Sequence, residues 1–182
     1  MLRALAFALA ALAFVACEDD DDLGTAEDVL ALDGPNLTGP ILEAGTHRFA
    51  VQFYPEDLEG FAGRNLETAR VFIGEAPESM RISVHEGGTT APGLELTAVN
   101  VTGFGQTRQF VDYRLPDLVP IDPAETLWIV AEVELAAAQQ SIGCDAGPAI
   151  DGGDWLWSGD RYLTYRERTS ESVNWNIRGV VE

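Results

Sequence analysis

The chain has 182 residues, of which 46% are hydrophobic, and carries a formal net charge of -19 at pH 7. This length accommodates one domain with a hydrophobic core. The apolar fraction excludes an intrinsically disordered chain, so the charge must lie on the surface of a folded body. Because a surface this negative repels phosphate groups, we expect no nucleic-acid partner.

The 11 basic residues are all arginine, against 30 acidic residues. This acid-rich, lysine-free composition resembles that of proteins from salt-loving organisms, in which concentrated salt shortens the range of charge repulsion. A GC-rich genome, which favours arginine codons, is the alternative explanation for the missing lysine.

The N-terminal segment has the three parts of a secretory signal peptide. Arg3 supplies the positive start, an apolar run extends from Leu5 to Val15, and the small residue Ala16 precedes a cleavage point. The run is too short to form a stable transmembrane anchor. We therefore predict a signal peptide at residues 1–16.

Residues 14–17, Phe-Val-Ala-Cys, resemble the lipobox of bacterial lipoproteins, in which a small residue precedes the cysteine that is lipidated. The resemblance implies acyl chains on Cys17, and several chains on one residue anchor a protein stably in a membrane. The alternative is an ordinary signal peptide that a cysteine happens to follow. With Cys17 lipidated, Cys144 has no intrachain disulfide partner, and we predict a buried thiol there.

An acidic run occupies residues 18–22 and resembles the acidic tag of surface-exported lipoproteins of the Bacteroidetes type. The resemblance implies a lipoprotein exposed on the outer membrane, and a solvated linker is the alternative. Glycine and proline recur up to Pro40, so we predict a flexible linker over residues 17–45 that holds a domain off the membrane.

The rest of the chain, residues 46–182, has the pattern of short strands separated by glycine- and proline-rich turns. The predicted strands are 46–53, 70–73, 81–85, 94–101, 107–115, 127–133 and 174–181. Strand 127–133 is apolar on both faces at its start and is predicted to be central. One short helix is predicted to begin at Pro55 and cap one end. The fold class is therefore all-β, a jelly-roll-like β-sandwich with one short helix.

Several segments share their order along the chain with a known module, and they are 55–58, 71–74, 82–88, 127–133, 143–149 and 174–178. In this order they resemble a β-sandwich module of secreted and cell-surface proteins of the Bacteroidetes, similar to cleaved-adhesin and galactose-binding-like jelly rolls. The resemblance implies a non-catalytic binding or accessory protein whose partner is an extracellular glycan or an envelope protein.

The segment from Gly143 to Asp160 contains four aspartates among five glycines. Calcium takes six to eight oxygen ligands from carboxylates and from the carbonyls of bent loops. A calcium site is one interpretation of this pattern, and a structured polar loop without metal is the interpretation that the spacing favours. The candidate ligands are Asp145, Asp151, Asp154 and Asp160.

Aromatic residues Trp155, Trp157 and Tyr162 lie in and beside the same segment. Aromatic faces stack on sugar rings, so these residues are candidates for a glycan site. The alternative is that Trp155 and Trp157, which share one face of a strand, belong to the core. No catalytic set is recognisable, and we predict no enzyme. The other hypotheses are a structural module of an envelope complex and a hydrolase with an unrecognised site.

Overall fold

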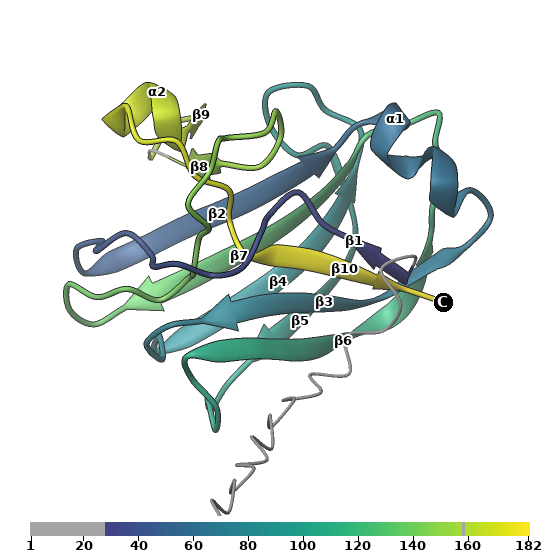
Figure 1. Cartoon of the computed structure of the whole chain (residues 1–182). Helices are drawn as coiled ribbons and strands as arrows, with labels where there is room; N and C mark the ends of the chain where they lie inside the picture. The colour runs from purple at the N-terminus through teal and green to yellow at the C-terminus, as the bar shows by residue number, and fades with distance from the viewer. Residues whose placement is uncertain (1–27, 158) are drawn as a thin grey trace, which may run out of the picture.

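The computed structural model describes residues 28–157 and 159–182, which form two antiparallel sheets packed face to face (Figure 1). The predicted signal peptide, Cys17 and the acidic run lie outside these residues. The four-stranded sheet has the order β1 (Val29–Leu30), β10 (Ile177–Val181), β3 (Asn65–Ile73) and β6 (Gln109–Pro120). The six-stranded sheet has the order β5 (Leu94–Val101), β4 (Ser79–Glu86), β7 (Leu127–Leu135), β2 (Gly45–Phe53), β8 (Trp155–Trp157) and β9 (Tyr162–Thr164). The predicted all-β sandwich is confirmed.

The core lies between the two sheets because each strand directs alternate side chains inward. In β2, for example, Phe49, Val51 and Phe53 are buried in the core. Strand β7 lies between β4 and β2, as its doubly apolar start predicted. Trp175, just before β10, is fully buried, and its ring packs edge-on against Phe49 with the centroids 5.1 Å apart.

The predicted short helix is α1 (Pro55–Leu58), which a 3₁₀ turn at residues 59–61 extends. Proline suits the first helical position because its missing N–H would be unpaired there, and the Asp57 carboxylate accepts a hydrogen bond from the Tyr54 N–H at 2.8 Å. Leu58 is buried, so the helix covers one end of the sandwich as predicted (Figure 1).

A second short helix, α2 (Tyr165–Thr169), was not predicted. Thr164 caps it, because the Thr164 hydroxyl accepts a hydrogen bond from the Glu167 N–H at 3.2 Å. A helix of five residues is too short to produce a helical repeat of apolar positions. No helix in the part of the chain that the structure describes is long and apolar enough to span a membrane.

The prediction of a flexible linker up to residue 45 is wrong for residues 28–45. Strand β1 pairs with β10, and Leu30 and Leu32 are buried. The Asp33 carboxylate has no exposed surface and forms an ion pair with Arg178, with 2.9 Å between Nη2 and Oδ2. The folded domain therefore already includes residue 28. The segment was predicted to be a linker because it contains glycine and proline, and its two-residue strand β1 is too short to show an alternating pattern.

Candidate functional site

The outer face of the six-stranded sheet points away from the core and carries an unusual mixture of aromatic and polar side chains. Because side chains alternate along a strand, the strand register decides which of them become neighbours on this face. Three of the rows that cross the sheet form the site. One joins Ser83, Val130, Ala50 and Trp155, the second joins His85, Trp128 and Gln52, and the third joins Arg81, Glu132 and Arg48.

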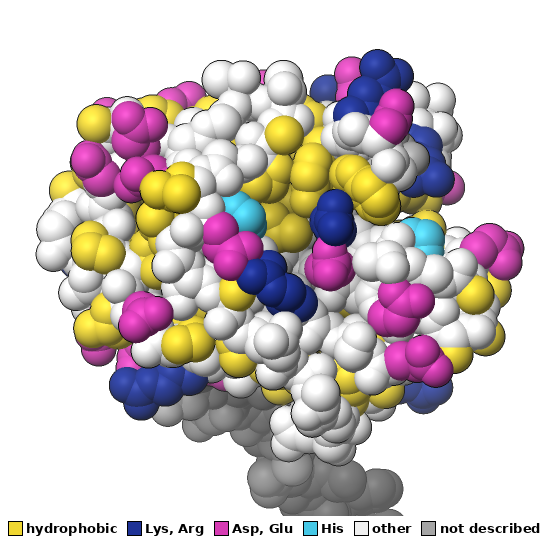
Figure 2. Space-filling model, turned by 180° about the vertical axis from the view of Figure 1, so that it is seen from behind, with side chains coloured by type: hydrophobic (Ala, Val, Ile, Leu, Met, Phe, Trp, Pro, Cys, Tyr) yellow, Lys and Arg dark blue, Asp and Glu magenta, His cyan; other side chains and the backbone are white. Residues whose placement is uncertain are grey.

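The centre of this face is an aromatic cluster, which we call the aromatic face and define as Trp128, Trp155, Trp157 and Tyr162. The Trp128 ring is buried and lies 5.5 Å from the Trp155 ring and 6.2 Å from the Tyr162 ring, centroid to centroid. The other three members are partly exposed. Figure 2 shows apolar side chains gathered in a hollow on this side of the molecule.

Leu156 between the two outer tryptophans points into the core and is fully buried. The short strand β8 therefore directs Leu156 inward and Trp155 and Trp157 outward. The hypothesis that the two tryptophans belong to the sandwich core is thus wrong. Trp155 packs instead on the small outer cluster of Ala50, Trp128 and Val130.

Arg48 and Glu132 form one border of the aromatic face. The Arg48 guanidinium lies 4.5 Å from the centre of the Trp157 ring and also forms an ion pair with the Glu132 carboxylate. The stacking fixes the orientation of both the ring and the guanidinium. Burial raises the pKa of the nearby Tyr162 hydroxyl to about 12, so this group stays a hydrogen-bond donor at neutral pH.

His85 and Ser83 form the opposite border. His85 Nδ1 lies 3.3 Å from the Gly93 carbonyl oxygen, so Nδ1 carries the proton, and Nε2 accepts a hydrogen bond from the Ser83 hydroxyl at 2.9 Å. Burial lowers the pKa of His85, although the Gly93 carbonyl and Glu95 act in the other direction. His85 is therefore neutral at pH 7.

The loop between β4 and β5 closes one end of the aromatic face. The Gly88 carbonyl oxygen accepts hydrogen bonds from Trp128 Nε1 at 3.3 Å, from Gln52 Nε2 at 3.3 Å and from the Thr126 hydroxyl at 3.0 Å. Position 88 needs glycine because its φ is 88° and a Cβ there would collide with the Ala91 carbonyl. The loop thereby holds the Trp128 ring in place.

Two buried polar atoms of this face, Gln52 Oε1 and Trp155 Nε1, have no hydrogen-bond partner within the described structure. Buried polar groups in native proteins are nearly always paired, so each unpaired one calls for an explanation. Gln52 lies on β2 and Trp155 lies on β8, and these two strands pair with each other. The unpaired atoms therefore mark the same part of the sheet as the aromatic cluster.

The four aspartates predicted as calcium ligands do not come together. No group of three or more His, Cys, Asp or Glu side chains that could hold a metal ion occurs among residues 28–157 and 159–182. Asp151 and Asp160 are exposed, whereas Asp145 and Asp154 are buried. The predicted calcium set is therefore not formed by the described residues, and the structure agrees with the alternative of a structured polar loop.

Asp145 orders this loop through its own hydrogen bonds. Its carboxylate accepts four, from the backbone N–H groups of Gly34, Gly147 and Asn174 and from the Asn174 side chain, at 2.8–2.9 Å. Burial opposes the charged form, but these bonds outweigh it, so the pKa of Asp145 is lowered. The Asp145 carboxylate is therefore the centre of the hydrogen bonds that order this loop.

Asp154 fixes the start of helix α2. Its carboxylate accepts a hydrogen bond from the Arg166 N–H at 3.0 Å, and its carbonyl oxygen accepts one from the Tyr165 N–H at 2.7 Å. Burial raises the pKa of this carboxyl group. Asp154 thus connects the residue before β8 to helix α2, whereas Asp145 connects its loop to Gly34 and Asn174.

Sequence reasoning found Trp155, Trp157 and Tyr162, which the structure brings together on the aromatic face. It missed Trp128, Arg48 and His85, which come from three different strands. One signal was present in the sequence: the start of β7 is apolar on both faces, which means that something must cover its outer side as well.

No protein-family model matches the chain, and a comparison with curated proteins found no match. Two solved structures share its fold. One is the clostridial cysteine protease Cwp84 after propeptide cleavage, with a TM-score of 0.60 and 10% identity over 85% of this chain and 39% of that chain. The other contains the cysteine protease and lectin-like domains of Cwp84, described as a surface layer associated protein of Clostridium difficile, with a TM-score of 0.54 and 8% identity over 77% of this chain and 33% of that one. This chain thus spans well under half of either structure, and the similarity shows the fold alone.

Proposed function

We propose that this protein is a non-catalytic binding module of the cell surface whose aromatic face holds an extracellular glycan. The observation that carries the proposal is the cluster of partly exposed aromatic rings on the outer side of a sheet whose core is already filled on the other side. Folding does not require these rings in the core, so their clustering calls for another explanation.

The chemistry of the face suits a sugar chain. Aromatic surfaces pack on the C–H faces of sugar rings, while the Glu132 carboxylate, the Arg48 guanidinium and the Tyr162 hydroxyl supply acceptors and donors for sugar hydroxyl groups. These polar groups lie directly beside the rings: Arg48 covers Trp157, and Trp157 pairs with Tyr162 across β8 and β9. An apolar protein surface could not form hydrogen bonds with these polar groups.

The residues that could act as nucleophiles lack the usual activation. Cys144 is buried, and burial raises its thiol pKa to about 11, whereas catalytic cysteines have lowered values. Ser83 does contact His85, but a backbone carbonyl, in place of a carboxylate, faces His85 Nδ1. A serine triad needs a carboxylate at that nitrogen. These observations support binding over hydrolysis.

The fold similarity adds support of a limited kind. The second of the two similar structures includes a domain described as lectin-like in a surface layer associated protein. A lectin-like origin for this chain would account for an all-β sandwich with aromatic side chains on one outer face. At 8% identity the similarity concerns the fold alone, so the proposal of a glycan ligand rests on the aromatic face.

A glycan array followed by titration tests the proposal. We expect at least one glycan to bind, to change tryptophan fluorescence, and to bind about tenfold more weakly to Trp157→Ala, which corresponds to about 1.4 kcal/mol. Trp157 is partly exposed on the outer side of the sheet, so this variant should stay folded, and its thermal midpoint verifies that.

Leu118→Ala is the matched control. Leu118 is an exposed apolar residue of β6 in the other sheet, with 47% of its surface accessible. This variant should bind as well as the wild type. Equal weakening by both substitutions, or an array without any bound glycan, would contradict the proposal.

The location on the cell surface belongs to the same proposal. It rests on the predicted signal peptide and on the lipobox-like residues 14–17, which precede the described part of the chain. Cys17→Ser should release the protein from membranes, and labelled palmitate should enter only the wild type. Wild-type protein that never takes up the label would refute the lipid anchor and leave the glycan site unaffected.

A further inference from the structure

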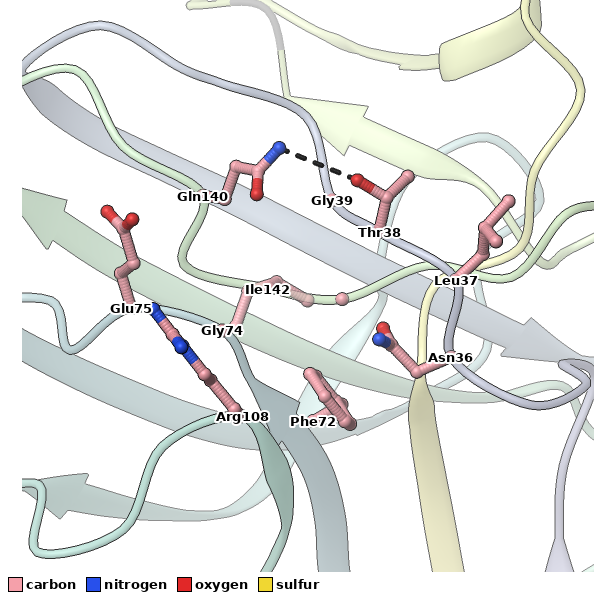
Figure 3. Close-up of a pocket in the computed structure, with 11 residues that line it drawn as sticks. Asn36, Leu37, Thr38, Gly39, Phe72, Gly74, Glu75, Arg108, Gln140 and Ile142 are labelled. Atoms are coloured by element: carbon pink, nitrogen blue, oxygen red, sulfur yellow. Dashed lines mark hydrogen bonds between the residues drawn. The ribbon is translucent and has the colours of Figure 1, made fainter.

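A pocket of about 430 Å³ opens on a different part of the molecule (Figure 3). Its wall is made where the segment before β2, the end of β3 and the segment after β7 run side by side, as the bridges Thr38–Cys144 and Ile73–Ile142 show. A pocket of this size is in the range that holds small molecules. None of its lining residues belongs to the aromatic face.

The backbone at Gly143 lies very close to the side chains of Asn36 and Phe72, and this close packing shapes the pocket. A Cβ at Gly143 would lie 2.6 Å from Cδ1 of the Phe72 ring and would also collide with the Asn36 carboxamide, so only glycine fits there. Phe72 is partly exposed, and its ring stands edge-on to Phe110 with 5.4 Å between the centroids. One wall of the pocket is therefore the Phe72 ring, which packs between Gly143 and Phe110.

The polar lining is rich in groups with spare hydrogen-bonding capacity. Asn36 Oδ1 is buried and has no partner in the described structure, and the bond from Gln140 Nε2 to the Thr38 hydroxyl is long at 3.5 Å. In Figure 3 the Asn36 carboxamide points towards Phe72 and Ile142. Among the described residues the exposed Arg108 side chain forms no ion pair, although it lies beside Glu75 (Figure 3).

Arg108 has a left-handed backbone with φ of 60°, which is unfavourable for a residue with a side chain. Its N–H donates a hydrogen bond to the Ile73 carbonyl at 2.5 Å, which holds this conformation at the end of β3. Backbone strain of this kind occurs preferentially at ligand sites. Here the strained position carries the arginine that lines the pocket.

We propose that this pocket binds one unit of a neutral sugar, independently of the aromatic face. The guanidinium and the two carboxamides donate hydrogen bonds to sugar oxygens, the exposed Glu75 carboxylate accepts them from hydroxyl groups, and the Phe72 ring packs on the C–H face. Donors and acceptors are mixed, as a polyol requires. An anionic ligand is disfavoured because Glu75 lies beside Arg108 and the whole chain carries a charge of -19.

The test uses the purified full-length protein with glucose, galactose, mannose and N-acetylglucosamine, and with galacturonate as the anionic counterpart of galactose. Saturation-transfer NMR and calorimetry measure binding. We expect at least one neutral sugar to bind with a Kd of about 1 mM or below, and galacturonate to bind more weakly than galactose. Stronger binding of galacturonate, or no binding of any neutral sugar, would overturn the proposal.

Arg108→Gly assigns the signal to this pocket. Glycine adopts a φ of 60° without strain, so this variant should keep the wild-type thermal midpoint while its affinity falls at least about tenfold. Arg114→Ala, an arginine of β6 outside the pocket with 78% of its side chain exposed, should bind as the wild type does. Unchanged affinity in Arg108→Gly would refute the pocket site.

Trp157→Ala separates this proposal from the glycan site on the aromatic face. It should leave the single-sugar affinity unchanged. If Trp157→Ala abolishes the single-sugar signal and Arg108→Gly does not, the pocket proposal fails and the aromatic face stands. If only Arg108→Gly has an effect, the pocket stands whatever the glycan array shows for the face.

Discussion

Trp175 connects the sandwich core to the strand that carries the outer tryptophans, and its replacement should affect both. Its ring is fully buried between Phe49 and Tyr165, with centroid distances of 5.1 Å to each. Its indole Nε1 donates a hydrogen bond to the Trp155 carbonyl at 2.8 Å. The side chain thus packs the core and also holds the inner side of β8.

Two substitutions separate these contributions. Trp175→Ala removes the whole ring and should cost about 3–5 kcal/mol in the free energy of unfolding. Trp175→Phe keeps an aromatic ring between the two neighbours but removes the indole donor. We expect it to cost about 1 kcal/mol for the lost hydrogen bond and a further roughly 1 kcal/mol for the smaller volume.

Urea unfolding followed by far-ultraviolet circular dichroism measures both values, with an unchanged slope as the sign of intact two-state behaviour. Trp175→Phe should also weaken glycan binding to the aromatic face by several-fold, although Trp175 is not part of that face, because β8 loses one of its attachments. A loss of stability below about 1 kcal/mol for Trp175→Ala would refute the packing argument. A fully stable Trp175→Phe with normal binding would refute the attachment to β8.

Three further predictions concern charge. The lowered pKa of His85 means that the folded state favours the neutral imidazole, so this contribution is complete above about pH 6.5 and is lost as pH falls through the depressed value. His85→Gln should therefore flatten the decline of the thermal midpoint between pH 7 and pH 5, and an unchanged slope would contradict this. Asp145→Asn should destabilise the protein by about 2–3 kcal/mol, measured by urea unfolding, because the amide cannot accept all four hydrogen bonds, and a loss close to zero would mean that the loop does not depend on them. Thermal midpoints should rise from low to molar salt as repulsion within a chain of net charge -19 is screened, and a flat profile would count against a halophilic surface.

Individual strands were predictable because their side chains alternate locally. The apolar positions Phe49, Val51 and Phe53 have the period of two that a half-buried strand requires, and the structure forms β2 there. The proline-led helix at Pro55 was equally readable because its signal lies within a few residues. Cys144 is a free, buried thiol in the structure, as predicted.

The predictions were wrong where a segment was too short to show an alternating pattern or where only closeness in sequence was used. Residues 28–45 contain glycine and proline at linker-like density, and their two-residue strand β1 cannot show any alternation. The four aspartates of the 145–160 segment looked like a ligand set because they are close in sequence. Asp145 and Asp154 instead use their lone pairs on backbone N–H groups of the fold, and such partners cannot be identified from residue types.

The amino-acid sequence by itself determined the all-β class, the positions of most strands and the aromatic residues at the end of the chain, because each of these depends on neighbours within a few residues. Only the tertiary structure decided which face those residues occupy and what stands beside them. Arg48 and Glu132 are 84 residues apart in the chain, yet strand pairing makes them neighbours. A one-residue shift of register would send Trp128 into the core and Ile129 to the surface, and that choice is settled by the packing of two whole sheets.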